Sequence, residues 1–256
     1  MQALIVHLQV LHGLILREIR TRFGVNRLGY LWALLEPIMM IATFAIFYRL
    51  FGRLAPLHLG MMAFLTSGFI PFILFRETIS RTSKAVDGNR GLLFYPMVRP
   101  LDLALARIFL EFVTQVVVFA ILMGADAFYR NRFEINNPLD LLTGMCLASG
   151  LGGSFGLLFC SLSTFSPTVD RLIAPLLRPM FWISALFYPA TSVPSHLQGL
   201  LLLNPLVHSI ELVRRGWFHD YPVADVNVEY PLYVILTVLF AGLLVERAAR
   251  RRIQLS

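Results

Sequence analysis

Ionisable side chains inside long apolar runs are the residues of this sequence that could do chemistry. The first is Glu36, which stands next to Pro37 in the stretch "WALLEPIMM". A carboxylate that faces lipid at the middle of a helix costs about 2.5 kcal/mol or more, so we expect Glu36 to face protein or water. It would then act as the proton-coupling acid of an ion-driven carrier, or as a hydrogen-bonding anchor where Pro37 bends the helix.

No other group of residues has the spacing of a catalytic centre. The chain contains no H-E-x-x-H, Cys-x-x-Cys or G-x-S-x-G motif, and its six histidines are scattered. Glu111 follows Arg107 by four residues, which predicts a structural ion pair on one helix face. Cys146 and Cys160 would lie roughly 21 Å apart on one helix, too far for a disulfide, and are interpreted as inert core residues. We therefore expect no catalytic residue, no metal site and no cofactor bound by this chain.

The composition indicates a protein built into a membrane. Of the 256 residues, 57% are hydrophobic and only 14% are charged, whereas soluble domains carry about 25% charged residues. The net charge of +7 does not indicate a nucleic-acid partner, because the basic residues neither gather on one helix face nor alternate with stacking aromatic residues. We expect membrane lipids, and no nucleic acid, around this protein.

Six apolar segments are long enough to cross a bilayer, which requires about 20 residues, or about 17 at the short limit. They cover residues 28–51, 59–75, 103–128, 139–162, 172–189 and 230–246. An even number places both chain ends on one side, and sixteen of the 22 Lys and Arg residues then fall on that side. Because basic loops stay in the cytoplasm, we predict an all-α protein with six transmembrane helices and both termini cytoplasmic.

Residues 1–27 are interpreted as a helix that lies on the cytoplasmic face of the membrane. Arg17, Arg20 and Arg22 could reach lipid head groups from such a helix. The apolar residues that recur at helical spacing are Leu4, Leu8, Leu11, Ile15 and Ile19. A poorly ordered tail is the alternative.

The connection 76–100 is predicted to be a short exposed helix followed by a rigid return. Its first half is compatible with a helix up to the Asp87-Gly88-Asn89 stop, and its second half ends in Pro96 and Pro100. This shape, held at the cytoplasmic surface, would suit the docking of another protein. The alternative is a solvated loop whose arginines only set the orientation of the chain.

The connection between Tyr188 and Tyr230 is expected outside and should contain two helices. The stretch "LQGLLLLNPL" is apolar but too short to span, and a second helix follows Asn204-Pro205. In that second helix Glu211 would pair with Arg214 and Arg215 on a polar face. The opposite, apolar face would hold Leu206, Ile210, Val213 and Trp217. The two helices would dip into the outer leaflet, or rest on the bundle as a cap.

Small residues recur at every fourth position within one apolar segment. They are Gly144, Ala148, Gly152 and Gly156. Such a ridge lets helix backbones approach closely, either inside one chain or between two copies of it. No lysine follows these glycines where a nucleotide-binding loop requires one, so we expect this chain to have no ATP site of its own.

Four motifs, in order and over nearly the whole chain, resemble those of ABC-2 type permeases. The first is "RFGVNRLGYLWALLEPIMM", in which a basic interfacial helix leads through Leu-Gly-x-Leu-Trp to a proline. The others are Asn89 through Pro96 and Pro100, Asn204-Pro205, and Glu211 with Arg214. The short chain, the Glu36-Pro37 pair and the absence of a fused ATPase or large extracellular domain are most similar to the inner-membrane permease of Gram-negative capsular polysaccharide exporters. O-antigen and teichoic-acid exporters share this plan.

The resemblance implies one ABC-2 type transmembrane domain, residues 1–256, in the bacterial inner membrane. It implies a homodimer clasped by two copies of a separate cytoplasmic ABC ATPase, which would bind ATP and Mg. Residues 76–90 would form the coupling helix on the ATPase, with Glu77, Arg81, Lys84, Asp87, Asn89 and Arg90 as contacts. The outer helices would be re-entrant, and the residues that define them are Asn204, Pro205, Glu211, Arg214 and Arg215.

The resemblance also implies a polymer channel at the dimer interface, made from the first and fifth spans. An acidic, lipid-linked capsular polysaccharide would move through it to the periplasm, where periplasmic and outer-membrane export proteins would receive it. The candidate path residues are Tyr30, Trp32, Glu36, Phe44, Phe47, Arg49, Arg53, Trp182, Phe187 and Tyr188, because sugar rings stack on aromatic faces and arginine attracts acidic polymer. Arg214 and Arg215 could add to that attraction at the outer end. The alternatives are an ABC-2 exporter of O-antigen, teichoic acid or a drug, and, in a different class, an ion-coupled carrier.

Overall fold

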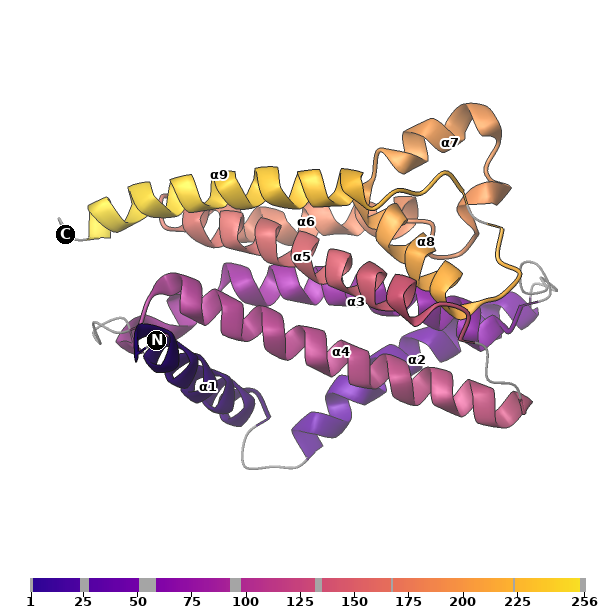
Figure 1. Cartoon of the computed structure of the whole chain (residues 1–256), viewed down its shortest axis with the longest axis horizontal. Helices are drawn as coiled ribbons and strands as arrows, with labels where there is room; N and C mark the ends of the chain where they lie inside the picture. Colours follow the sequence, from indigo (N-terminus) through magenta and orange to yellow (C-terminus); the bar gives the residue numbers. More distant parts are fainter. Residues whose placement is uncertain are drawn as a thin grey trace.

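The described part of the chain is helical throughout its regular elements. The computed structural model describes residues 2–23, 28–50, 59–92, 98–131, 135–166, 168–222 and 224–253. Its elements are α1 (Gln2–Phe23), α2 (Leu28–Leu50), α3 (Met61–Ser83), η2 (Asp87–Leu92), α4 (Pro100–Arg130), α5 (Pro138–Ser163), α6 (Thr168–Ile183), η3 (Ala190–Ser192), α7 (Ser195–Leu202), α8 (Pro205–Trp217) and α9 (Glu229–Ile253). Helix α1 and the end of α9 lie at one end of the molecule, called the terminal end below, and α7 and α8 lie at the opposite, distal end (Figure 1).

Four of the described helices are long and apolar enough to cross a bilayer. These are α3, α4, α5 and the part of α9 from Glu229 to Ala249, and they match four of the six segments predicted from the sequence. Helix α2 occupies the first predicted segment, and its described apolar stretch, Leu35–Tyr48, is shorter. The expected all-helical architecture is therefore confirmed for the described residues, with Pro37 inside α2.

Helix α6 is shorter than the predicted segment 172–189. It ends at Ile183, and Ala185 adopts a left-handed backbone conformation with φ of 55°, which a continuing α-helix does not allow. The chain then runs without helix to Pro189, and Ser184, Ala185 and Leu186 are completely buried. The prediction of a helix to residue 189 was wrong because apolar composition alone does not reveal a buried turn.

Helix α3 continues through the region where a separate helix was predicted. Residues 76–83 form its last two turns, and Thr78, Ile79 and Thr82 are buried. The prediction of a short exposed helix from residue 76 was wrong, because Arg76 and Glu77 do not end the span. Instead the chain leaves α3 after Ser83, and η2 covers the Asp87-Gly88-Asn89 stop.

Helix α5 is central to the bundle and contacts α3, α8 and α9 most extensively. A Cβ atom added to Gly144 would lie 2.6 Å from the carbonyl oxygen of Ser209 in α8. A Cβ atom added to Gly152 would lie 2.8 Å from the carbonyl oxygen of Phe75 in α3. The ridge of small residues therefore packs inside the chain, as one of the two expected arrangements requires. Cys160 on the same helix is buried, but Cys146 is exposed, so the interpretation of both as core residues was half wrong.

The amphipathic N-terminal segment forms helix α1 and is fastened to the terminal end of the bundle. Arg17 donates to the side-chain oxygen of Asn89 in η2 over 3.0 Å. Glu18 forms an ion pair of 2.9 Å with Arg107 of α4. These contacts place α1 across the terminal end of α4 (Figure 1).

The two distal helices, α7 and α8, form where the sequence predicted them. Asn204 caps α8 by accepting from the backbone N–H of Leu206, and Pro205 occupies the first turn, where its missing N–H costs nothing. The predicted pair of Glu211 with Arg214 is confirmed at 2.9 Å, and neither side chain has exposed surface. Helix α8 is enclosed by α5 and α3, so both of its faces are buried. Arg215 pairs with Asp140 of α5 instead of with Glu211, over 2.7 Å.

Candidate functional site

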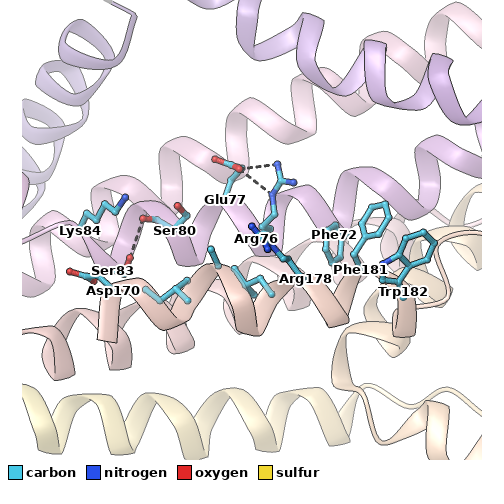
Figure 2. A pocket seen from close by; sticks show the side chains of 13 residues that line it. Phe72, Arg76, Glu77, Ser80, Ser83, Lys84, Asp170, Arg178, Phe181 and Trp182 are labelled. Carbon is cyan, nitrogen blue, oxygen red and sulfur yellow. Dashed lines mark hydrogen bonds and ion pairs between the residues drawn. The ribbon is translucent and has the colours of Figure 1, made fainter. Parts of the chain in front are cut away.

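The main cavity of the described structure lies between α3 and α6, towards the terminal end. It encloses about 490 Å³. In Figure 2, Lys84 and Asp170 lie at one end of the cavity, Arg76 and Arg178 lie near its middle, and Phe72, Phe181 and Trp182 lie at the other end. The cavity therefore has a charged part and an aromatic part.

Three cations line the charged part. Arg76 is paired with Glu77 of its own helix, at 3.0 Å between Nη2 and Oε1. Lys84 and Arg178 form no ion pair within the part of the chain that the structure describes. Two acids, Glu77 and Asp170, face these three cations across the lining, so the lining carries an excess of positive charge.

The Asp170 carboxyl is one of the two counter-charges for these cations. It lies in the first turn of α6, and one of its oxygens is buried without a hydrogen-bond partner. Because three cations face two acids, an anion that enters the cavity would find cations that the protein does not fully neutralise.

The aromatic part continues into a cluster of rings towards the distal end. The aromatic cluster consists of Phe44 of α2, Phe69 and Phe72 of α3, Phe181 and Trp182 of α6, and Phe187. Phe187 touches four of these rings: its centroid is 4.9 Å from Phe44 and 5.6 Å from Trp182, on which it stacks. The structure thus brings together three of the predicted path residues, Phe44, Trp182 and Phe187.

The remaining predicted path residues are more dispersed. Trp32 and Phe47 are exposed on α2, and Tyr188 is half-buried beside Phe187. Glu36 is 59% exposed and lies 3.5 Å from Nη2 of Arg76, which agrees with the expected anchor to a basic group of a neighbouring helix. The side chains of Tyr30 and Arg49 and the whole of Arg53 lie outside the described residues.

The predicted coupling residues occupy the terminal end of α3 and the turn after it. Glu77 and Lys84 line the cavity, and Arg81 forms an ion pair of 3.0 Å with the buried Glu111 of α4. Asn89 is buried and donates to the backbone oxygen of Ala85, whereas Asp87 is exposed. The Arg90 side chain lies outside the described part of the chain.

The predicted ion pair between Arg107 and Glu111 was wrong, because each of these residues pairs with a residue of another helix. Arg107 reaches Glu18 of α1 and donates to the backbone oxygen of Arg81 over 2.6 Å. Helical spacing allows a pair on one helix but cannot exclude a neighbouring helix that offers a better partner.

Sequence reasoning missed several residues that line the cavity. They are Phe72, Arg76, Asp170, Arg178 and Phe181. One signal was available: Arg178 precedes Trp182 by four residues, so the two share a face of any helix. Within the described ranges, no three His, Cys, Asp or Glu side chains are placed to hold a metal ion.

The comparisons with known proteins show to which family this sequence belongs. Residues 9–218 match the family model described as ABC-2 type transporter. The chain belongs to the ABC-2 type transporter family. The family match covers α2 to α8 and so includes the cavity, the aromatic cluster and the paired charges of α8.

Three relatives show which members of the ABC-2 family are similar to this chain. The polysialic acid transport protein KpsM of Escherichia coli is 37% identical over 236 residues, which cover 92% of this chain and 91% of the relative. The capsule polysaccharide export inner-membrane protein CtrC of Neisseria meningitidis is 27% identical over 96% of this chain and 92% of the relative. An O-antigen export system permease protein, RfbA of Klebsiella pneumoniae, is 22% identical over 87% of this chain and 86% of the relative.

Proposed function

We propose that this chain is the membrane-spanning permease subunit of an ATP-driven exporter of capsular polysaccharide in the bacterial inner membrane. The similarity to the polysialic acid transport protein, at 37% identity over 92% of the chain, carries this proposal. The cavity supports it, because exposed cations and aromatic rings are the groups that bind an acidic glycan or its phosphate-bearing lipid anchor.

Six membrane crossings follow if α2 and α6 also span. Helix α2 has 23 residues, or about 34 Å of helix, which exceeds the roughly 30 Å hydrocarbon core. Helix α6 has 16 residues and would complete its crossing with residues 184–189. Non-helical backbone is tolerated at that depth only when protein covers it, and the burial of Ser184, Ala185 and Leu186 supports this reading. Helices α7 and α8 would then dip into the outer leaflet.

The terminal end would face the cytoplasm, where two ATPase subunits would clasp a homodimer of this chain. The turn from Lys84 to Leu92 would receive the motion of the ATPase, since it connects α3 to α1 through Asn89 and Arg17. Because α3 is continuous from this turn to the distal end, a displacement of the turn would reach the aromatic cluster through Phe72 and Phe69.

The polymer would enter from the inner leaflet through the cavity. Its acidic groups would meet Arg178 and Lys84 first, because neither cation has an ion-pair partner in the described structure. Its sugar rings would then stack on Trp182 and Phe181. Outward movement would follow ATP binding, when closure of the ATPase dimer shifts α3. Arg49 and Arg53, which were predicted from the sequence alone, stay predicted contacts of acidic polymer.

The experiment that tests this proposal is ATP-dependent export in a reconstituted system. The permease is purified with a candidate standalone ABC ATPase from the same organism, incorporated into liposomes, and supplied with lipid-linked acidic polysaccharide. We expect polymer to cross only with hydrolysable ATP. Isolation of the permease without any ATPase, together with transport that follows a proton gradient, would refute the proposal and support an ion-coupled carrier.

A matched pair of variants locates the site in the same assay. Arg178→Gln should lower export of an acidic polymer about three- to tenfold, since one charge-assisted contact is worth roughly 1 kcal/mol or more. Arg171→Gln is the control, because Arg171 is exposed on the same helix but does not line the cavity. Equal losses in both variants would assign the effect to general surface charge.

A further inference from the structure

Residues 184–190, which are the connection between α6 and η3 together with the first residue of η3, are held by side chains from two different helices. Arg214 of α8 donates from Nη2 to the carbonyl oxygen of Leu186 over 2.9 Å and from Nη1 to that of Tyr188 over 3.1 Å. The hydroxyl of Tyr48 in α2 donates to the carbonyl oxygen between them, that of Phe187, over 2.6 Å. Three successive carbonyls of a non-helical segment are thus satisfied by side chains, as burial requires.

The attachment through Arg214 is rigid. Its side chain has no exposed surface, it pairs with Glu211, and its guanidinium lies 4.2 Å from the centre of the Phe64 ring. A Cβ atom added to Gly68 of α3 would lie 2.8 Å from Nη2 of Arg214. Glu211 in turn accepts from the Tyr221 hydroxyl over 2.8 Å and from the Ala190 N–H over 3.3 Å. This set of contacts fixes one side of the segment to α3 and α8.

The attachment through Tyr48 belongs to a different part of the molecule. Tyr48 follows Phe44 by four residues, so both lie on one face of α2. Phe44 contacts the ring of Phe187 at 4.9 Å, while Tyr48 binds its carbonyl. Helix α2 therefore holds the backbone and the ring of the same residue, and a shift of α2 must act on Phe187 directly.

Phe187 joins the rings that three different helices contribute to the aromatic cluster. Its ring touches Phe44, Phe69, Phe181 and Trp182, which come from α2, α3 and α6. Phe181 and Trp182 are also the aromatic end of the cavity. The Phe187 ring therefore packs on the aromatic end of the cavity.

We propose that Tyr48 and Arg214 are positioning residues that hold Phe187 as a seal at the distal end of the cavity, and that displacement of α2 breaks the Tyr48 bond and opens this seal. Arg214 keeps residues 184–190 in place. Tyr48 makes the position of Phe187 depend on the position of α2. The proposal rests on the proposed export function, in which the cavity is the entry to the path.

The first test measures the position of Phe187 without any polymer. In a background with Trp32→Phe, the remaining fluorescence comes from Trp182, which stacks on Phe187, and from Trp217, which is 5% exposed and packs on Phe119. Trp182 is 65% exposed, and Tyr48→Phe and Arg214→Lys should each raise its acrylamide quenching further, because the ring face that stacks on Phe187 loses its neighbour. The controls Tyr233→Phe on α9 and Arg130→Lys on α4 should leave the quenching unchanged.

The second test measures export and uses Phe187 itself as the reference. Because Tyr48→Phe would leave the seal open even when α2 has not moved, ATP hydrolysis should continue while the amount of polymer exported per ATP hydrolysed falls about threefold or more, the ratio that corresponds to one lost hydrogen bond. In a Phe187→Ala background the same change should cost nothing further, because both changes act through one ring. Additive losses, or unchanged quenching in Tyr48→Phe, would overturn the proposal. Because quenching needs no substrate, a wild-type protein that exports no polysaccharide would refute the proposed function alone.

Discussion

Buried charged side chains of this protein are neutralised by partner residues that also form hydrogen bonds to other groups. Glu211 accepts hydrogen bonds from Arg214, Tyr221 and the Ala190 N–H, and none of its own surface is exposed. A buried carboxylate is tolerated only with such partners, and the loss of one of them leaves an uncompensated charge. The partners of these residues therefore determine how each responds to substitution and to pH.

Tyr221 makes the stability of the distal end sensitive to alkaline pH. Burial raises the pKa of its hydroxyl well above the ordinary value of 10.0, and the charge of Arg214 opposes part of the rise. Above about pH 10 the unfolded chain releases this proton and the folded chain keeps it, so the free energy of unfolding falls as pH rises. Thermal unfolding in detergent between pH 9 and 11 should show a steeper loss for the wild type than for Tyr221→Phe. Parallel curves would contradict this assignment.

Glu36 is expected to act through its contact with Arg76 and not as a proton relay. The pair is 3.5 Å long and Glu36 is 59% exposed, so its contribution to stability is at most about 1 kcal/mol. Glu36→Gln keeps an oxygen that can accept from Arg76, and export should fall less than about threefold. Export by liposomes at fixed ATP concentration measures this. Complete loss of export in Glu36→Gln, with folding intact, would support a proton-coupling role.

At the scale of the elements, α5 approaches its neighbouring helices closely because several of its contact positions are glycine. Gly144 contacts α8, and Gly152 and Gly156 contact α3. The backbones therefore approach closely, which strengthens dispersion contacts between helices that have no hydrophobic drive to associate in lipid. The position of α3, which bears the lining of the cavity, depends on this contact.

Gly152→Ala should destabilise the protein by about 1–3 kcal/mol, because the new methyl group would overpack a helix contact. Its Cβ atom would lie 2.8 Å from the backbone oxygen of Phe75, which cannot move aside as a flexible side chain could. Gly124→Ala on α4 is the matched control: nothing lies within 4 Å of its added Cβ atom, and alanine should be neutral or slightly stabilising there. Thermal unfolding midpoints of the two variants in detergent measure the difference.

The sequence predicted most elements because their signals are local. Apolar length indicated α3, α4, α5 and α9, the Asn204-Pro205 pair indicated the start of α8, and the small residues indicated a close helix contact. The extent of α3 and α6 was not predictable in this way. Arg76 continues a helix because Glu77 and Glu36 neutralise it, and α6 ends because Arg214 and Tyr48 satisfy the carbonyls that follow.

At the scale of the whole molecule, the candidate site joins residues that are distant in the sequence. Its charged part combines Arg76 of α3 with Arg178 of α6, and its seal adds Phe44 of α2. Phe44 and Trp182 could be predicted from residue type and from the family resemblance. Arg178 could not, since only the packing of α6 against α3 gives it a place beside Arg76.

Helix α1 and the end of α9 both lie at the terminal end, and this predicts on which side of the membrane each connection between helices lies. In a background with Cys146→Ala and Cys160→Ala, a cysteine at Ser195 of α7 should react with a membrane-impermeant maleimide in intact spheroplasts. A cysteine at Thr168, the exposed first residue of α6, should react only after the membrane is opened. The reverse pattern would contradict the cytoplasmic assignment of the terminal end.

The two ends of the protein should respond differently to ionic strength. The ion pairs of the terminal end are partly exposed, with 38% of Arg81, 21% of Glu18 and 13% of Arg107 accessible, whereas Glu211 and Arg214 have no accessible surface. Salt screens exposed charges over about 10 Å at 0.1 M and about 3 Å at 1 M, but acts little on buried ones. Hydrogen exchange at high salt should therefore quicken in η2 and α1 and stay slow in residues 184–190. In the proposed topology, the ionic strength of the cytoplasm would then adjust how firmly the terminal end is held, while residues 184–190 stay firmly held at the other end.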